Sequence, residues 1–257
     1  MSLLTNLVSQ LPFYLLRLPI VFFALSFHEA AHGYVAYKLG DPTARSLGRL
    51  TLNPAKHIDP IGFLSMVLFR VGWAKPVPIN TRYFKKPKRD MALAGAAGPL
   101  ANLLLAVINL VVLRLALIPI TNAYSTEMSH YLGSIYAGSS FTGTVAFTAV
   151  SLVVYLLYMG VILNISLAIF NLIPVPPFDG SRIFYAFLPT KWYFAVMKYE
   201  RIIMMVVLVA FVFGFLDGPI NWIFSLVSGG LFSMVGMPEN ALSILLHYVN
   251  SLLSLRF

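Results

Sequence analysis

Residues 141–170 read FTGTVAFTAVSLVVYLLYMGVILNISLAIF and carry no charged side chain. An apolar run of about 20 residues is long enough to cross a bilayer as a helix, so this stretch predicts a transmembrane span. Residues 11–38 and residues 91–117 have the same character and predict two more spans before it. Together the three stretches predict the helical core of an all-α polytopic membrane protein.

The composition of the chain supports this class. Of its 257 residues, 59% are hydrophobic and 11% are charged, whereas roughly 25% are charged in ordinary soluble domains. A soluble domain of this size still exposes about a quarter of its unfolded surface area, so the composition excludes a soluble enzyme, a disordered chain and a nucleic-acid-binding module. The chain contains no cysteine, and a metal ion would therefore be bound by His, Asp, Glu or water.

The remaining stretches predict further elements around this core. Residues 202–216, 218–238 and 240–255 are apolar enough for two or three more spans, which gives five to six in total. Between the first two spans, residues 61–69 are apolar but too short to cross, and residues 73–80 contain two prolines. We therefore expect a re-entrant element or a small β-hairpin between spans one and two.

The distribution of charge predicts the orientation of the chain in a membrane. There are 18 Lys and Arg residues against nine Asp and Glu residues, for a net charge of +9. Residues 38–89 carry 11 of the basic residues and residues 171–201 carry four, whereas residues 118–140 carry none. Because cytoplasmic loops are enriched in Lys and Arg, the two basic loops are expected in the cytoplasm and the N-terminus outside. The basic run at residues 82–89 predicts contact with anionic lipids of the bilayer.

The first predicted span contains a group of ionisable residues, His28-Glu29-Ala30-Ala31-His32. Positions i and i+4 of a helix share a face, so His28 and His32 can bind one zinc ion, and Glu29 is placed to accept a proton from the attacking water. The alternative is that these side chains lie among lipid headgroups at the end of the helix. Ionisable residues in a spanning helix cost about 2.5–3.5 kcal/mol each, which favours the metal site.

A catalytic zinc needs a third protein ligand, and Asp179 is the leading candidate. It follows residues 171–178, NLIPVPPF, which cannot form regular helix. Irregular backbone at membrane depth is tolerated only where it lines a cavity or is buried in protein, so Asp179 is expected at the mouth of a polar pocket. The alternative is that Asp179 caps a helix that begins near residue 181.

Two further motifs follow the first one along the chain. They are Gly98-Pro99-x-x-Asn102 and Asn171-x-x-Pro174-x-Pro176-x-x-Asp179-Gly180. In this order the three motifs resemble the site-2 protease family of intramembrane zinc metalloproteases over residues 10–190. Residues 48–54, GRLTLNP, and residues 72–78, GWAKPVP, resemble the short members that lack an inserted PDZ domain. Phe178 stands where Leu is more usual in the family, and it preserves the bulk of that side chain.

The resemblance implies a role for each motif residue. It implies that His28, His32 and Asp179 bind zinc, one ion per chain, and that Glu29 is the general base. It also implies that Asn171 helps to hold the substrate backbone. The alternative for Asn171 is that its amide satisfies the proline-broken backbone of its own segment.

Three other polar residues are secondary candidates. His57 lies on the expected active-site side and is a possible accessory residue, either a metal ligand before activation or a proton shuttle. A loop histidine in a turn is the simpler interpretation. Asn102 and Asn164 are expected to form hydrogen bonds between helices.

We therefore predict one transmembrane protease domain over residues 1–257, with core motifs at residues 10–190 and additional helices at residues 200–257. The predicted function is zinc-dependent hydrolysis of peptide bonds within transmembrane segments of other proteins, that is, regulated intramembrane proteolysis. The expected location is a prokaryotic cell membrane, with the active site toward the cytoplasm. The alternative is a zinc-binding membrane protein without proteolytic activity, such as a transporter, sensor or scaffold. A transporter would be expected to show further acidic or His residues along a path, and the predicted spans carry almost none.

Overall fold

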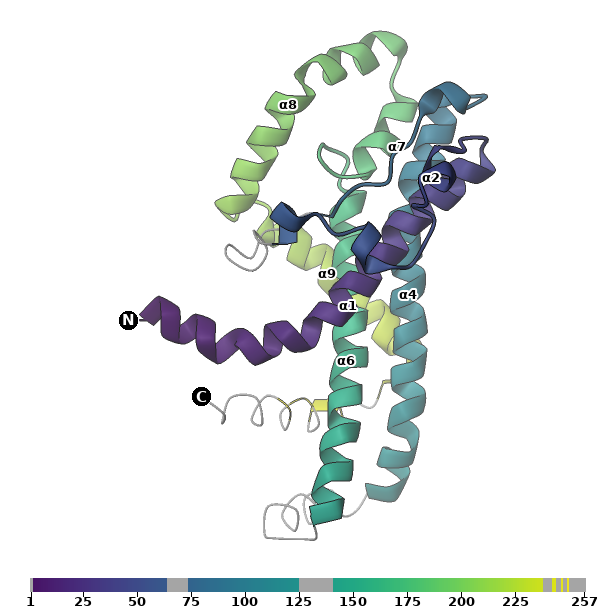
Figure 1. Cartoon of the computed structure of the whole chain (residues 1–257). Helices are drawn as coiled ribbons and strands as arrows, with labels where there is room; N and C mark the ends of the chain where they lie inside the picture. Colours follow the sequence, from purple (N-terminus) through teal and green to yellow (C-terminus); the bar gives the residue numbers. More distant parts are fainter. Residues whose placement is uncertain are drawn as a thin grey trace. The chain divides into compact units, whose positions relative to one another are not determined.

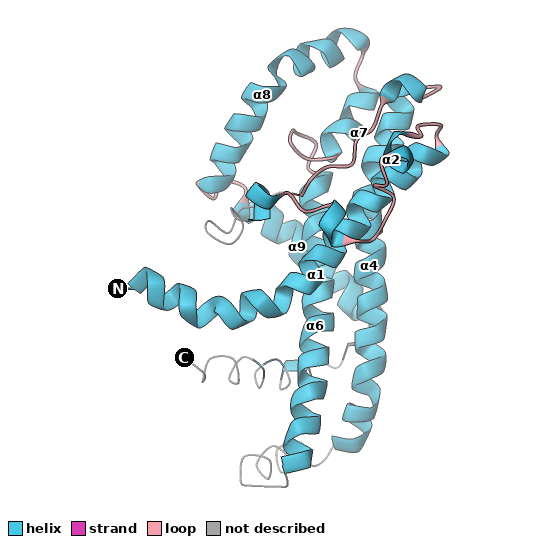
Figure 2. Ribbon diagram, in the orientation of Figure 1, coloured by secondary structure: helices cyan, strands magenta, loops and turns pink. Residues whose placement is uncertain are grey.

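The computed structural model describes residues 2–63, 74–124 and 141–237, together with residues 242, 243, 246 and 249. Helices dominate this part of the chain, and no named strand occurs in it (Figures 1 and 2). The chain forms two compact units, which we describe one at a time. Unit 1 draws on Met1–Ile20, Ala106–Ile162 and Gly229–Phe257, and unit 2 comprises Val21–Leu105 and Leu163–Ser228.

The observed helices include all three that the apolar runs predict. The runs at residues 11–38, 91–117 and 141–170 lie within α1, α4 and α6, and α1 ends at the predicted residue. The helices are α1 (Ser2–Lys38), α2 (Thr43–Ser46), α4 (Pro87–Tyr124), α6 (Phe141–Leu172), α7 (Gly180–Phe187), α8 (Thr190–Val212) and α9 (Asp217–Val235), with the 3-10 turns η1 (Pro54–Lys56) and η2 (Thr81–Tyr83).

Three helices of the described part of the chain are long and apolar enough to cross a membrane. They are Pro87–Ile118 within α4, Thr148–Leu172 within α6, and α9. The helix α1 is not among them, in keeping with the polar His-Glu-x-x-His group in its C-terminal half. Three of the five to six predicted spans are thus supported. The expected elements at residues 61–69 and 240–255 lie largely outside the described residues.

The expected β-hairpin is not confirmed. Residues 75–80 have no regular secondary structure, and the ladder in the described ranges is a single antiparallel bridge between Ile58 and Ala74. The physical reason lies in Pro76 and Pro78, because proline has no N–H to donate to a strand ladder.

The end of α1 is fixed by a glycine-dependent cap. Gly40 has φ of +110°, in the left-handed region that favours glycine. Its N–H donates to the carbonyl of Tyr37 at 3.1 Å, and the N–H of Asp41 donates to the carbonyl of Ala36 at 3.0 Å. This is the Schellman pattern, which satisfies the last carbonyls of a helix and turns the chain away from its axis.

Unit 1 has an apolar core between α4 and α6. Leu113, Leu117 and Val154 are almost fully buried there and pack with Leu242. Within the same unit, Arg17 donates two hydrogen bonds to the Tyr155 hydroxyl, at 3.0 and 2.9 Å.

Unit 2 depends on close approach of its helices. The small residues at 94–99 of α4 allow this approach, because an added Cβ at Gly95 would lie 3.1 Å from the Cβ of Arg182 in α7. The same helix also approaches α1, since a Cβ at Gly98 would lie 2.6 Å from Cε1 of His28. A Cβ would not fit at position 98 and would be crowded at position 95, so the N-terminal half of α4 is the surface on which α1 and α7 both pack.

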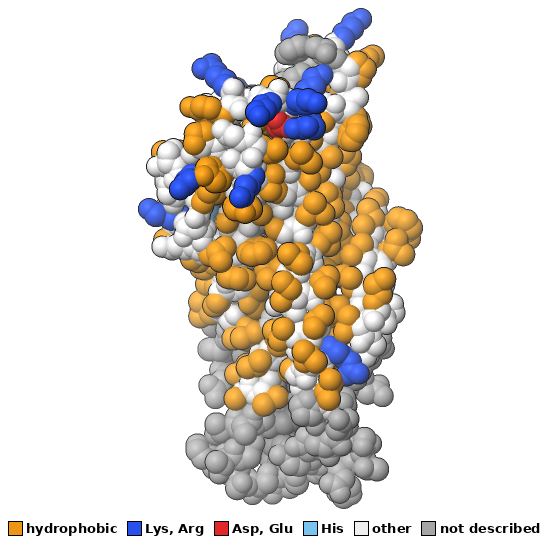
Figure 3. Space-filling view, turned by 90° about the vertical axis from the view of Figure 1, so that its right-hand side faces the viewer, with side chains coloured by type: hydrophobic (Ala, Val, Ile, Leu, Met, Phe, Trp, Pro, Cys, Tyr) orange, Lys and Arg blue, Asp and Glu red, His pale blue; other side chains and the backbone are white. Residues whose placement is uncertain are grey.

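The outer surface of α4 is apolar along its length. Large hydrophobic side chains at Leu100, Leu104, Ile108 and Leu115 are between 47% and 60% exposed and recur at helical spacing. On the face drawn in Figure 3, hydrophobic side chains predominate and Lys and Arg side chains are fewer. A continuous apolar surface of this kind is typical of contact with lipid.

Replacing Gly40 with Ala is expected to lower the thermal unfolding midpoint of the purified protein by a few degrees. A side chain in the left-handed region costs about 1–2 kcal/mol, and the carbonyl oxygen of Tyr83 would lie 3.3 Å from the new Cβ. The matched control is Gly229→Ala in α9, where a Cβ meets nothing within 4 Å and alanine favours the helix. Equal midpoints for the two variants would contradict this account of the cap.

Candidate active site

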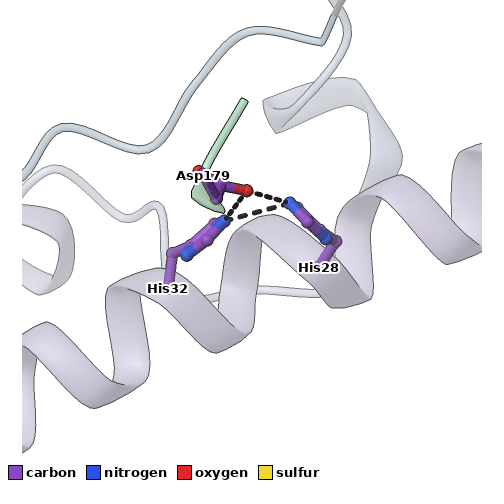
Figure 4. A group of neighbouring side chains, drawn as sticks. All are labelled: His28, His32 and Asp179. Carbon is purple, nitrogen blue, oxygen red and sulfur yellow. Dashed lines mark hydrogen bonds and ion pairs between the residues drawn. The ribbon is translucent and has the colours of Figure 1, made fainter. Parts of the chain in front are cut away.

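Three side chains from two helices meet at one point of unit 2. His28 and His32 project from α1, and Asp179 immediately precedes α7 (Figure 4). Oδ2 of Asp179 lies 3.1 Å from Nε2 of His28 and 3.1 Å from Nε2 of His32. The two Nε2 atoms are 3.0 Å apart. The sequence proposed these three residues as metal ligands, and the fold brings them together.

The helix geometry of α1 accounts for the arrangement of the two imidazoles. Because His28 and His32 are separated by one turn, their rings lie on the same face, with centroids 4.5 Å apart and planes at 87°. Both histidines are buried, at 5% and 6% exposure. Buried imidazoles need partners for both ring nitrogens, and the outer nitrogens reveal which tautomer is present.

The outer nitrogen of each histidine faces an oxygen that can only accept. Nδ1 of His28 lies 2.5 Å from Oδ1 of Asn102, and Nδ1 of His32 lies 2.7 Å from the carbonyl oxygen of Ala94. The orientation of the Asn102 amide is fixed by its Nδ2, which donates to Oδ1 of Asn164 at 2.8 Å. Nδ1 therefore carries the hydrogen on both rings, and the Nε2 lone pairs point at Asp179.

Asp179 stands at the N-cap position of α7 but does not act as a cap. Its carboxylate makes no capping hydrogen bond and is directed at the two histidines instead. Its place is fixed by Gly180, where a Cβ would lie 2.5 Å from the carbonyl oxygen of Ile173. The proline-broken segment and α7 are thus packed backbone to backbone, which holds the carboxylate over α1.

The charge of Asp179 suits a cation. An aspartate side chain is ordinarily a carboxylate at neutral pH. Three acceptor atoms facing one another repel unless protons or a cation lie between them, and two imidazole nitrogens with one carboxylate oxygen form a donor set that zinc uses at catalytic sites. The residues present fit a zinc ion.

Glu29 lies next to the first histidine and is partly buried. Its Oε2 accepts a hydrogen bond from the backbone N–H of Val77 at 2.8 Å. The carboxylate is thus held in one orientation beside the group formed by His28, His32 and Asp179.

Asn171 and His57 lie outside this group. Nδ2 of Asn171 donates to the carbonyl of Leu167 one turn earlier in α6, at 2.9 Å. His57 is almost fully buried in the turn after η1, and its Nε2 lies 2.8 Å from the carbonyl oxygen of Thr51. For His57, the geometry agrees with a loop histidine that has a structural contact.

Sequence reasoning missed the partners that orient the ligands. Asn102 was expected only to connect helices, yet it also holds the imidazole of His28. One feature of the sequence indicated this contact. Asn102 is one turn from Gly98 and so shares the face of the helix that approaches the histidines. The Ala94 carbonyl and the Val77 N–H are backbone groups, which leave no residue-type signal in a sequence.

A model of the family described as peptidase family M50 matches residues 17–215, more than half of the chain. The chain belongs to peptidase family M50. The matched range includes His28, Glu29, His32 and Asp179, and it confirms the resemblance to site-2 proteases drawn from the motifs.

Named relatives agree with the family. A Bacillus subtilis protein named "Putative zinc metalloprotease YwhC" is 40% identical over 176 residues, which cover 68% of this chain and 69% of that protein. "Putative zinc metalloprotease Rip2" of Mycolicibacterium smegmatis is 28% identical over 163 residues, 61% of this chain and 51% of the relative. The protein of the same name from Mycobacterium tuberculosis is 26% identical over 213 residues, 79% of this chain and 70% of the relative. No solved structure matches the chain at comparable significance. Family and relatives identify this member of M50 as a zinc metalloprotease of the site-2 type.

Gly98→Ala is expected to abolish zinc binding by the purified protein. The added Cβ would lie 2.6 Å from Cε1 of both His28 and His32, so the rings would have to leave their positions. Gly230→Ala is the matched control, because a Cβ there meets nothing within 4 Å. Zinc content per chain, measured by mass spectrometry of the metal, checks the result, and equal content in the two variants would contradict the proposed ligands.

Asn102→Ala is expected to lower zinc affinity about 10- to 100-fold, because His28 loses the acceptor that fixes its tautomer and ring orientation. Asn221→Ala, at an exposed position of α9, is expected to bind zinc like the wild type. Competition with a chromophoric chelator measures both affinities. An Asn102→Ala protein with wild-type affinity would show that the hydrogen bond does not orient the ligand.

Proposed function

We propose that this M50 protein is an intramembrane endopeptidase that hydrolyses peptide bonds within transmembrane segments of other proteins. One zinc ion per chain would be held by His28, His32 and Asp179. The observation that carries the proposal is the convergence of these three donor atoms, all within 3.1 Å of one another, beside Glu29.

The apolar surface supports a reaction within a bilayer. The described chain offers three helices that can span, and the stripe of exposed Leu and Ile along α4 suits contact with lipid. The lipid bilayer is accordingly one partner in this proposal, and a transmembrane protein substrate is the other. Such a substrate has to unwind locally, because the carbonyls of a helix are hydrogen-bonded and sterically shielded.

The chemistry is divided between the metal and the residues of this chain. A bound zinc supplies Lewis acidity, which polarises a carbonyl and makes water a competent nucleophile near neutral pH. Glu29 accepts the proton of the attacking water and passes it to the leaving amine. Since Oε2 of Glu29 is occupied by the N–H of Val77, the proton is carried by Oε1. Asn171 contributes Oδ1, which can accept a hydrogen bond from an N–H of an unwound substrate.

Residues 75–80 are the place where an unwound substrate would add as a strand. Pro76 and Pro78 have no N–H, and the N–H of Val77 is bound to Glu29. Pairing would therefore use the N–H of Ile79 and carbonyls beyond Pro76, because Arg49 donates to the carbonyls of Lys75 and Pro76.

The proposed membrane topology follows from the distribution of Lys and Arg residues among the loops. Five to six spans form one protease domain, with the helices beyond residue 200 added to the core. The lengths of α1 and α8, 37 and 23 residues, are sufficient for a span. The basic loops, and with them the active site, face the cytoplasm of a prokaryotic cell.

Glu29→Gln tests this function most simply. The variant is expected to bind zinc like the wild type and to cleave single-span substrates about 10²- to 10⁴-fold more slowly, because the proton acceptor is lost. Glu200→Gln, an exposed residue of α8, is the matched control and should cleave normally. The assay uses purified protein in detergent with a panel of single-span substrates, and zinc content is measured in parallel.

The other outcomes separate the rival functions. Zinc-loaded wild-type protein that cleaves no substrate of the panel would favour a sensor or scaffold. Wild-type protein that binds no zinc would contradict the metal site itself.

A further inference from the structure

A backbone segment, residues 75–80, lies extended beside α1 and is anchored at both ends. At its start, the N–H of Lys75 donates to the carbonyl of His57 at 2.8 Å. At its end, the N–H of Asn80 donates to Oδ2 of Asp41 at 2.7 Å. We refer to residues 75–80 as the anchored segment.

Arg49 holds the first half of the anchored segment. Its side chain is nearly buried, at 9% exposure. Nη2 donates to the carbonyl oxygens of Lys75 at 2.7 Å and Pro76 at 3.2 Å. A buried guanidinium that serves two backbone carbonyls fixes both peptide planes, and because proline already restricts φ, little freedom is left before residue 77.

Asp41 holds the second half. It is fully buried, and its Oδ1 also accepts the N–H of Thr43 at 2.9 Å. The carboxylate therefore ties the anchored segment to the turn that follows α1. That turn is itself fixed by the cap at Gly40.

Between the two anchors, Val77 meets α1 one residue after the second histidine. Its side chain is buried, and a Cβ at Gly33 would lie 3.0 Å from Cγ1 of Val77 and 2.7 Å from Cδ2 of Leu50. Glycine at position 33 thus allows the segment to lie against the helix. In this position the N–H of Val77 donates to Oε2 of Glu29 at 2.8 Å.

We propose that Arg49 and Asp41 are positioning residues for Glu29, which act by fixing the anchored segment so that the Val77 N–H holds the carboxylate of Glu29 in place. The inference rests on the proposed function, in which Glu29 is the general base. It assigns one shared task to two stretches of the sequence, GRLTLNP at residues 48–54 and GWAKPVP at residues 72–78. The first supplies the guanidinium and the second supplies the carbonyls and the N–H.

Glu29 needs such positioning because a glutamate side chain can adopt many conformations. Glu29 has three rotatable bonds, and a proton acceptor displaced by about 1 Å can cost about 100-fold in rate. A hydrogen bond from a fixed N–H to one carboxylate oxygen orients the other oxygen without neutralising the group. Neither Arg49 nor Asp41 is within the zinc-ligand group, so both act through the anchored segment.

The test compares Arg49→Met with Arg49→Lys and with Arg45→Met, an exposed arginine of α2. Arg49→Met removes the donors and keeps an unbranched side chain. It is expected to lower kcat about 10- to 100-fold, by more than any change in KM, with zinc content unchanged. Arg49→Lys retains one cationic donor and should recover part of kcat, and Arg45→Met should match the wild type. Asp41→Asn should lower kcat in the same direction.

Amide hydrogen exchange provides a readout that needs no cleavage. Residues 75–80 contain four backbone N–H groups, because two of the six residues are proline. Exchange in this segment should become faster in Arg49→Met and in Glu29→Ala, and stay unchanged in Arg45→Met. If the wild type cleaves nothing, the proposed function fails, and exchange still tests the anchors.

Three results would overturn the inference. One is Arg49→Met with wild-type kcat. Another is a change in KM with wild-type kcat, which would leave strand pairing with the substrate as the whole role of the segment. The third is unchanged exchange of residues 75–80 in Arg49→Met. If Arg49→Met does not fold, Arg49→Lys and Asp41→Asn are judged by the same criteria.

Discussion

The site depends on a single electrostatic constraint, the placement of three acceptor atoms within 3.1 Å of one another in a buried space. Two imidazole lone pairs and a carboxylate repel in a medium of low dielectric constant unless positive charge lies between them. The ring hydrogens do not relieve this repulsion, because Asn102 and Ala94 fix the hydrogens of His28 and His32 on the outer nitrogens. A divalent cation resolves the repulsion, and the family supplies zinc as that cation.

Glycines make this constraint possible. Gly98 lets α4 approach the histidine rings, Gly180 lets α7 pack on the backbone after α6, and Gly33 lets Val77 reach Glu29. At each of the three positions a Cβ would lie within 3.0 Å of an atom of the neighbouring segment. The same segments therefore determine both the packing of unit 2 and the chemistry of the site.

The core helices and the candidate ligands could be predicted from local sequence. Contacts between residues that are distant in the sequence could not. The end of α1 at Lys38 followed from the length and composition of the apolar run. The ligand set rested on a helical spacing for the histidines and on the motif around Asp179. The residues next to Asp179 are equally compatible with a cap of α7 and with a metal ligand, and the preceding prolines and the need of the histidines for a third ligand favoured the ligand. The hydrogen bond from the backbone N–H of Val77 to Glu29 could not be predicted from residue types, since any non-proline residue carries the same N–H.

The central claim is that His28, His32 and Asp179 hold one zinc ion. X-ray absorption at the zinc edge of the purified protein tests it directly, because imidazole rings give a characteristic outer-shell scattering pattern. The account predicts one zinc per chain with two imidazole ligands and only oxygen besides. It also predicts that His32→Ala no longer retains that ion. A wild-type spectrum with fewer than two imidazoles, or a purified protein that binds no zinc, would contradict the account.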